Sequence, residues 1–279
     1  MTSNGLMRVC ALLVFALATA GCEREQQPDR AAVTGAPTTG SVAEPAPEPV
    51  KLEEVLEITP EYVIGITYPE GEIRHPQLAA EMKRYADEQR AQFMEAVNAR
   101  AQGDGEDTLL YDLSLRFSEI LDSPELAVYA VDGSSFTGGA HGTALMERFV
   151  WLPQQGKWLT VADLLPAEQG QVAIADYVRE QLHTALSQRV DADEMSPAER
   201  SELIRDAGRV IEEGTTPEPE HFSIFEPVTN PAGKLVALRF IFPPYQVGPY
   251  ADGMQTVEVP ASVMRPHIDP RYLDLFADA

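Results

Sequence analysis

Cysteine is almost absent from this chain of 279 residues: the only two, Cys10 and Cys22, lie close to the N-terminus. The sequence after Cys22 therefore offers neither a disulfide nor a thiol nucleophile. The stability of that part must come from packing and hydrogen bonds, and its function from other side chains.

Basic residues are scarce as well. The chain has 21 lysines and arginines against 44 aspartates and glutamates, which gives a formal net charge of −23. So acidic a chain is poorly suited to neutralise phosphates, and this excludes nucleic acid as a partner. Electrostatics favours a basic partner protein instead, although an acidic surface commonly serves solubility alone.

Recognisable catalytic signatures are also missing. The sequence contains no phosphate-binding glycine loop, no nucleophile elbow and no paired-carboxylate motif. His75, His183, His221 and His267 are scattered, without the spacing of a zinc site. We therefore expect no metal and no cofactor, and the sequence indicates architecture and location better than activity.

The N-terminus has the pattern of an export signal. Arg8 precedes an apolar run at residues 9–18 that is too short to span a bilayer. Residues 19–22 (TAGC) follow and resemble the lipobox of bacterial lipoproteins. This pattern predicts a lipoprotein signal peptide over residues 1–21.

A lipobox implies that Cys22 is diacylated and becomes the new N-terminus. Glu23 stands where an aspartate would favour inner-membrane retention, so the expected location is the outer membrane, facing the periplasm. Cleavage after Ala20 is the alternative, and it would release a soluble periplasmic protein.

Residues 22–56 are predicted to form a disordered tether. Up to residue 49 they are rich in proline, glutamate, glutamine and alanine and hold almost no large apolar side chain. Such a stretch cannot bury enough surface to fold. It would separate a folded part from a membrane that the protein contacts through its N-terminal lipid only.

Beyond the tether, the periodicity of apolar residues predicts an α+β fold with mostly antiparallel sheets and packed helices. Helices are expected over residues 76–101, 167–189, 197–213 and 270–276. Strands are expected over residues 62–68, 109–121, 125–136, 145–152, 157–160, 222–228, 235–242 and 256–259.

Three motifs follow one another along the chain: residues 137–142 (TGGAHG), 156–165 (GKWLTVADLL) and 244–253 (PYQVGPYADG). Together they resemble an extracytoplasmic family found in RsiV-type lysozyme-sensing anti-sigma factors and in the non-catalytic region of PdaC-type peptidoglycan deacetylases. Stand-alone lipoproteins of unknown function carry it too.

The resemblance implies two parts: an N-terminal α+β part like the PdaC domain of unknown function (57–137), and an RsiV C-terminal-like α+β part (138–265). Residues 266–279 are expected to form a short terminal helix. The chain departs from the better-known members, because it has neither the sigma-binding segment with its transmembrane helix nor the deacetylase barrel. The resemblance therefore implies a binding lipoprotein of the cell envelope, with lysozyme or a peptidoglycan fragment as candidate ligand.

The expected binding residues come from the first and third motifs: Gly138, Gly139, His141, Tyr245, Pro249 and Tyr250. The glycines permit positive φ, which would place the histidine on a tight bend with exposed amides. The tyrosines would present rigid rings with polar tips, which suit an interface. In the alternative, the glycines only turn the chain and His141 hydrogen-bonds to backbone, while the tyrosines pack over the end of a sheet and lock the last hairpin. Trp151 and Trp158 flank a turn and are expected in core and hairpin packing rather than as a sugar platform.

Two other functions stay open. A cell-wall hydrolase would need a nucleophile or an acid and base beside His141, for which Ser134, Ser135, Asp132 and Asp163 are the candidates. The serines lack an elbow, and Asp163 is expected to cap the turn into the next helix. A structural or assembly partner of an envelope complex would also suit the tether.

Overall fold

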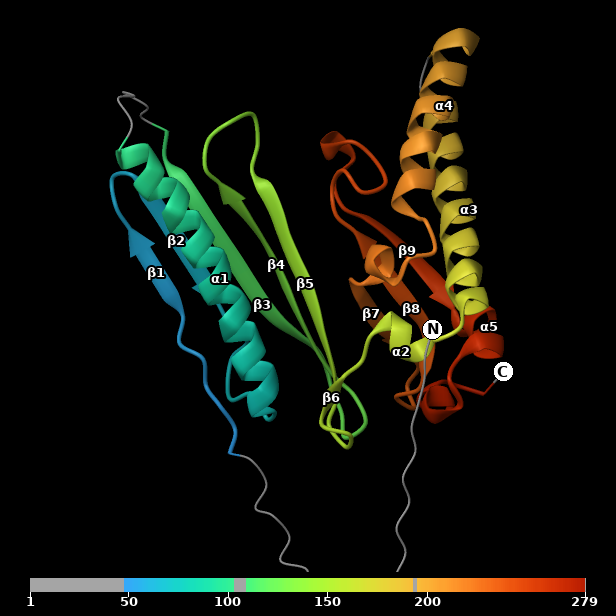
Figure 1. Cartoon of the computed structure of the whole chain (residues 1–279), viewed down its shortest axis with the longest axis horizontal. Coiled ribbons are helices and arrows are strands. Elements are labelled where there is room, and N and C mark those ends of the chain that lie inside the picture. The colour runs from blue at the N-terminus through green and yellow to red at the C-terminus, as the bar shows by residue number, and fades with distance from the viewer. Residues whose placement is uncertain (1–47, 103–108, 193–194, 279) are drawn as a thin grey trace, which may run out of the picture. The chain divides into compact units, whose positions relative to one another are not determined.

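The computed structural model describes residues 48–102, 109–192 and 195–278, which belong to one unit spanning Ala46–Ala279 (Figure 1). The predicted signal peptide, Cys22 and most of the predicted tether lie outside the described residues. No helix in the described part is both long and apolar enough to cross a membrane.

A six-stranded sheet forms the first half of the fold, in the order β1-β2-β3-β4-β5-β6. Its strands are β1 (Val55–Ile58), β2 (Tyr62–Thr67), β3 (Tyr111–Asp122), β4 (Ala127–Phe136), β5 (Thr143–Leu152) and β6 (Lys157–Trp158). All neighbours pair antiparallel except β2 and β3, which are parallel. A parallel pair needs a long crossover, and helix α1 (Pro76–Ala101) supplies it.

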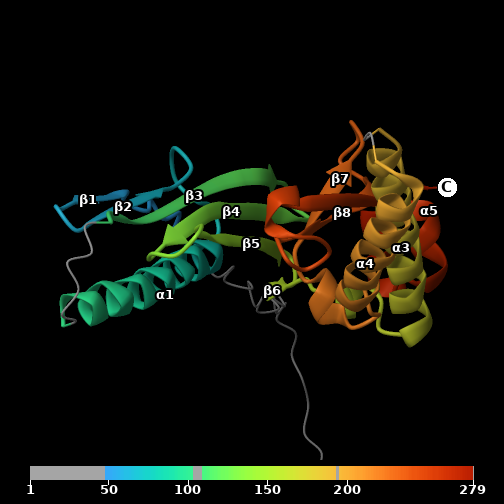
Figure 2. The same ribbon diagram turned by 90° about the horizontal axis from the view of Figure 1, so that it is seen from above.

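Helix α1 has the bounds that the sequence predicts. Pro76 opens its first turn, where a missing backbone N–H costs nothing. Leu78, Met82 and Phe93 lie one to several turns apart on one face, and all are at most 2% exposed. They pack on the sheet face formed by residues such as Leu113, and Figure 2 shows the helix lying along that face.

Part of the predicted tether, which was expected to end at residue 56, belongs to the fold. The backbone N–H of Val50 donates to the carbonyl of Ile73 at 2.9 Å, and the reverse bond measures 2.8 Å. Leu52 and Val55 pack against the core under α1. These apolar side chains anchor a stretch that composition alone assigned to the tether.

A three-stranded antiparallel sheet, in the order β7-β8-β9, carries the second half of the fold. The strands are β7 (Phe225–Thr229), β8 (Leu235–Phe242) and β9 (Gln255–Pro260). The α-helices are α2 (Val161–Leu164), α3 (Glu168–Ala192), α4 (Pro197–Gly214) and α5 (Ala261–Met264). The 3₁₀ helices are η1 (Pro219–Phe222), η2 (Tyr250–Asp252), η3 (Arg265–His267) and η4 (Pro270–Leu275), so the predicted terminal helix is a 3₁₀ helix.

One of the two hydrophobic cores contains residues of both sheets. Val128 and Val150, neighbours on β4 and β5, belong to the same buried cluster as Phe240 and Tyr272. The next residues along β4, such as Tyr129, face the core under α1. Residues 127–131 of β4 are therefore buried on both faces of the sheet.

The expected division of the fold at residue 138 does not coincide with a sheet boundary. Strands β5 and β6 follow residue 138 and pair in the first sheet. The mixed helix and strand content, with mainly antiparallel pairing, confirms the predicted α+β class.

Candidate functional site

Two segments far apart in the sequence meet at His141. Its Nε2 lies 2.7 Å from the hydroxyl oxygen of Tyr245, a hydrogen bond between residues 104 positions apart. Its ring stacks on that of Tyr250 with centroids 3.8 Å apart and planes inclined by 13°. The structure thus joins the first and third motifs, and we call these three residues the histidine–tyrosine cluster.

The bend between β4 and β5 presents the histidine. Gly138 and Gly139 have φ of 97° and 91°, where a side chain would be strained, so the expected positive φ is confirmed at both. A Cβ on Gly142 would lie 3.2 Å from the Ser135 carbonyl oxygen, which is a tight approach. Next to it, Nδ1 of His141 lies 3.0 Å from the Gly142 carbonyl oxygen.

The two tyrosines lie on residues 243–254, which we call the tyrosine loop. Tyr245 itself has φ of 75°, an uncommon conformation for a bulky residue. Its backbone N–H donates to the Gly248 carbonyl at 2.9 Å. The Gln246 side-chain amide donates to the carbonyls of Gly214 (3.1 Å) and His221 (2.9 Å). These bonds fasten the strained loop to α4 and η1, and strain held in this way often marks a functional position.

The cluster is accessible. Tyr245 is 60% exposed and Tyr250 37%, and His141 is exposed too. Neither tyrosine is buried, whereas the bond of His141 Nδ1 to the Gly142 carbonyl is the backbone contact that the alternative interpretation expects. Pro249, also exposed, precedes η2 and directs the chain into the turn that carries Tyr250.

The histidine and the two aspartates of the hydrolase alternative have other partners. Both ring nitrogens of His141 lie beside Tyr245 and Gly142. Asp132 pairs with Arg148 at 3.0 Å. No hydrogen bond in the described part of the chain joins the histidine to a serine or an aspartate.

Asp163 has the capping role that the sequence predicts. Thr160 is the N-cap of α2: its side chain accepts from the Asp163 N–H at 3.1 Å, and the Asp163 carboxylate accepts from the Thr160 N–H at 3.1 Å. Lys157 adds an ion pair at 3.1 Å. Burial opposes ionisation of Asp163, but the bonds from Thr160 and Lys157 outweigh it and lower the pKa of the carboxyl.

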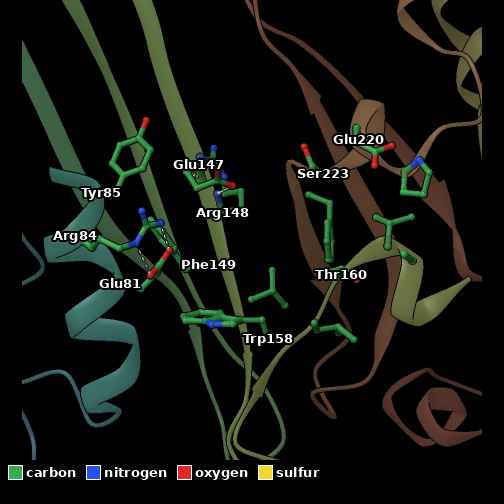
Figure 3. A pocket seen from close by; sticks show the side chains of 16 residues that line it. Glu81, Arg84, Tyr85, Glu147, Arg148, Phe149, Trp158, Thr160, Glu220 and Ser223 are labelled. Atoms are coloured by element: carbon green, nitrogen blue, oxygen red, sulfur yellow. Dashed lines mark hydrogen bonds and ion pairs between the residues drawn. The ribbon is translucent and has the colours of Figure 1, made fainter. Parts of the chain in front are cut away.

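A cavity lined by other residues than the cluster lies between α1, β5 and η1 (Figure 3). Its volume is about 440 Å³, and its lining includes Tyr85, Glu147 and Trp158. Trp158 does make the expected hairpin contact, edge to face with Trp151 at 4.8 Å, yet it stays 36% exposed toward this cavity. For Trp158, its place in a short strand after a turn was the one feature of the sequence that could have indicated a role at this cavity. No feature of the sequence indicated such a role for Tyr85 or Glu147.

Within residues 48–102, 109–192 and 195–278, no three histidine, aspartate or glutamate side chains are grouped so as to hold a metal ion.

Comparison with known proteins identifies one family model. Residues 162–262 match the family described as "Protein of unknown function (DUF3298)". The match runs from α2 to α5 and includes the tyrosine loop, whereas the bend at 138–142 precedes it. No curated protein matches the chain.

Two solved structures share the fold. A DUF3298 family member from Bacteroides fragilis NCTC 9343 is 16% identical with a TM-score of 0.51, over 81% of this chain and 94% of that one. A DUF3298 family protein from Pseudomonas aeruginosa PAO1 is 18% identical with a TM-score of 0.51, over 85% and 99%. At such identities the likeness shows the fold alone, and the expected relation to RsiV- and PdaC-type proteins stays a prediction.

Proposed function

We propose that this protein, built on a domain of unknown function, is an envelope-anchored binding lipoprotein that holds a basic protein at the histidine–tyrosine cluster. Lysozyme is the first candidate partner, because the three sequence motifs resemble those of lysozyme-sensing ectodomains. The observation that carries the proposal is the meeting of two of these motifs in one exposed aromatic cluster.

The chemistry of the cluster suits an interface. Tyrosine buries a large apolar area while its hydroxyl keeps a hydrogen bond, and few rotatable bonds are lost on binding. Because Tyr250 is stacked on His141 and Tyr245 is hydrogen-bonded to it, the rings are already ordered before a partner arrives. Preorganisation of this kind lowers the entropic cost of association.

Net charge supports a basic partner. With a formal charge of −23, the protein attracts cationic proteins over several ångströms and accelerates their encounter, an effect that salt weakens. Charge alone would attract any basic protein, so specificity must come from the short-range contacts of the cluster.

The decisive experiment is isothermal titration calorimetry of the purified protein with a c-type lysozyme at two salt concentrations. An equally basic protein, cytochrome c, serves as the control partner. We expect saturable lysozyme binding that survives raised salt and weakens about tenfold or more in Tyr250→Ala, as for an interface hot spot. Met254→Ala is the matched variant: it removes another exposed side chain, 48% accessible, from the same loop outside the cluster, and should bind normally.

Equal binding of both basic proteins, or equal affinity of the parent and Tyr250→Ala, would contradict a lysozyme site at the cluster. Soluble peptidoglycan fragments would then be titrated in the same way, as the second ligand that the resemblance implies.

Anchoring is tested separately by mass spectrometry of the mature protein from membranes. We expect acyl chains on Cys22 as the first residue. An unmodified N-terminus at Gly21 would instead indicate cleavage after Ala20 and a soluble periplasmic protein.

A further inference from the structure

The cavity of about 440 Å³ is large enough for a small organic ligand. Helix α1 forms one wall with Glu81, Arg84 and Tyr85, and β5 forms the back with residues 147–150. Trp158 and the first turn of α2 lie below, and η1 with the start of β7 closes the far side (Figure 3).

Four aromatic side chains line it: Tyr85, Phe149, Trp158 and Phe225. Tyr85 and Phe149 meet edge to face with centroids 6.1 Å apart, and Tyr85 contacts Phe117 in the same way at 6.3 Å. Trp158 is supported from behind by the buried Trp151. Packing thus holds the rings in place, and a group in the cavity would meet rigid π surfaces.

The arginines at the cavity are already neutralised. Arg84 forms ion pairs with Glu81 and Glu88. The Arg148 side chain, 4% exposed, directs its Nε to Glu226 at 2.7 Å and one terminal nitrogen to Asp132 at 3.0 Å. Neither guanidinium is therefore available to an anionic ligand without breaking these pairs.

Glu147, unlike the two arginines, has no direct ion-pair partner among the described residues. Its carboxylate accepts from the Arg148 backbone N–H at 2.9 Å. Burial raises the pKa of this carboxyl, although the Arg148 N–H and the charge of Arg148 act against the rise. Arg148 and Arg84 lie near enough for their charges to act on it, but a partly desolvated carboxylate that no cationic side chain pairs with directly still gains free energy when a cation contacts it.

From these observations we infer that the cavity binds an organic cation: a protonated amine or quaternary ammonium group attached to an apolar or ring-shaped body. The ammonium group would lie against the Glu147 carboxylate and the faces of the aromatic rings, where a cation is attracted by both. The apolar body would cover Val150 and Phe225 in the remaining lining. This site is separate from the histidine–tyrosine cluster and does not depend on the proposed function.

The test compares two probes of the same shape, 2-phenylethylammonium and neutral 2-phenylethanol, titrated into the purified protein by calorimetry. The chain has two tryptophans, Trp151 and Trp158, so intrinsic fluorescence gives a second readout close to the cavity. We expect the amine to bind at least about tenfold more tightly than the alcohol, the size of one charge-assisted hydrogen bond.

In Glu147→Gln this preference should disappear while the alcohol binds as before, because only the charge has been removed. Glu95→Gln, an exposed residue of α1 outside the cavity, makes the same change in net charge and should behave like the parent. Trp158→Leu should weaken the amine about threefold or more through the lost ring.

Absence of amine binding at millimolar concentration, equal binding of the two probes, or an unchanged preference in Glu147→Gln would each overturn the inference. Tighter binding of the alcohol would identify the cavity as a site for neutral ligands. Lysozyme binding is measured on the same variants, so the fate of this site and that of the cluster remain distinguishable.

Discussion

Replacing one partner of the buried ion pair Arg148–Glu226 should destabilise the protein strongly. The pair joins β5 of the six-stranded sheet to β7 of the three-stranded sheet, with Nε and Oε1 2.7 Å apart. The two side chains are only 4% and 11% exposed. A charge left behind in such surroundings has lost its most buried partner but keeps its desolvation cost.

The two ends of the pair are not equivalent. In Glu226→Leu, Arg148 would keep Asp132, a half-exposed carboxylate at 3.0 Å. We expect a loss of about 3–5 kcal/mol in the free energy of unfolding, the range for breaking a buried pair. In Arg148→Met, Glu226 would keep Arg239 at 3.3 Å, so we expect a smaller loss of about 2 kcal/mol, below that range.

The assay is urea unfolding followed by circular dichroism, with free energies from linear extrapolation. We expect the loss in the double variant to be smaller than the sum of the two single losses by about 2 kcal/mol or more, because neither buried charge then remains without the other. Arg205→Met is the control: its ion pair with Glu202 is long, 3.8 Å, and about 70% exposed, so little change is expected. Additive losses, or a Glu226→Leu variant within about 1 kcal/mol of the parent, would refute this reasoning.

Two further predictions concern the cluster and the cavity. A Cβ on Gly214 would lie 1.9 Å from the carbonyl oxygen of Gln246, so Gly214→Ala should displace the tyrosine loop, lower the melting temperature and weaken lysozyme binding. Gly65→Ala is the control, because a Cβ there meets open space and should leave lysozyme binding intact. Equal lysozyme binding by the two variants would contradict the prediction for Gly214. Because burial raises the pKa of Glu147, its ionised form opposes folding at neutral pH, and this cost fades as pH falls through the raised pKa toward the unfolded value. Glu147→Gln should therefore raise the melting temperature at pH 7.5 and change it little near pH 4; a rise of the same size at both would count against the explanation.

Much of the secondary structure follows from local patterns. The bounds predicted for α1 and β8 agree with the structure, because apolar spacing and flanking turn residues act within a few positions. Ser196 and Glu199 form the capping box that opens α4, a signal confined to four consecutive residues. The prediction was least accurate where tertiary contacts override composition, as at Val50, which a single bridge to Ile73 draws into the fold.

The candidate site was predictable only in its parts. Glycines and tyrosines in two motifs identify bends and exposed rings, since φ preference and side-chain chemistry are properties of single residues. Nothing in either motif states that His141 and Tyr245 form a hydrogen bond. The cavity could not be predicted from the sequence at all, because Glu147 and Tyr85 look like ordinary residues of a strand and a helix.

By itself, the sequence determined the α+β class, most element bounds, the acidic charge and the residue types of the cluster, because these depend on composition and on interactions between near neighbours. The tertiary structure alone decided the parallel pairing of β2 with β3, the hydrogen bond between His141 and Tyr245, and the ion pair between Arg148 and Glu226. Each joins positions far apart in the chain, and such contacts depend on how whole sheets and helices pack together, which no local periodicity encodes.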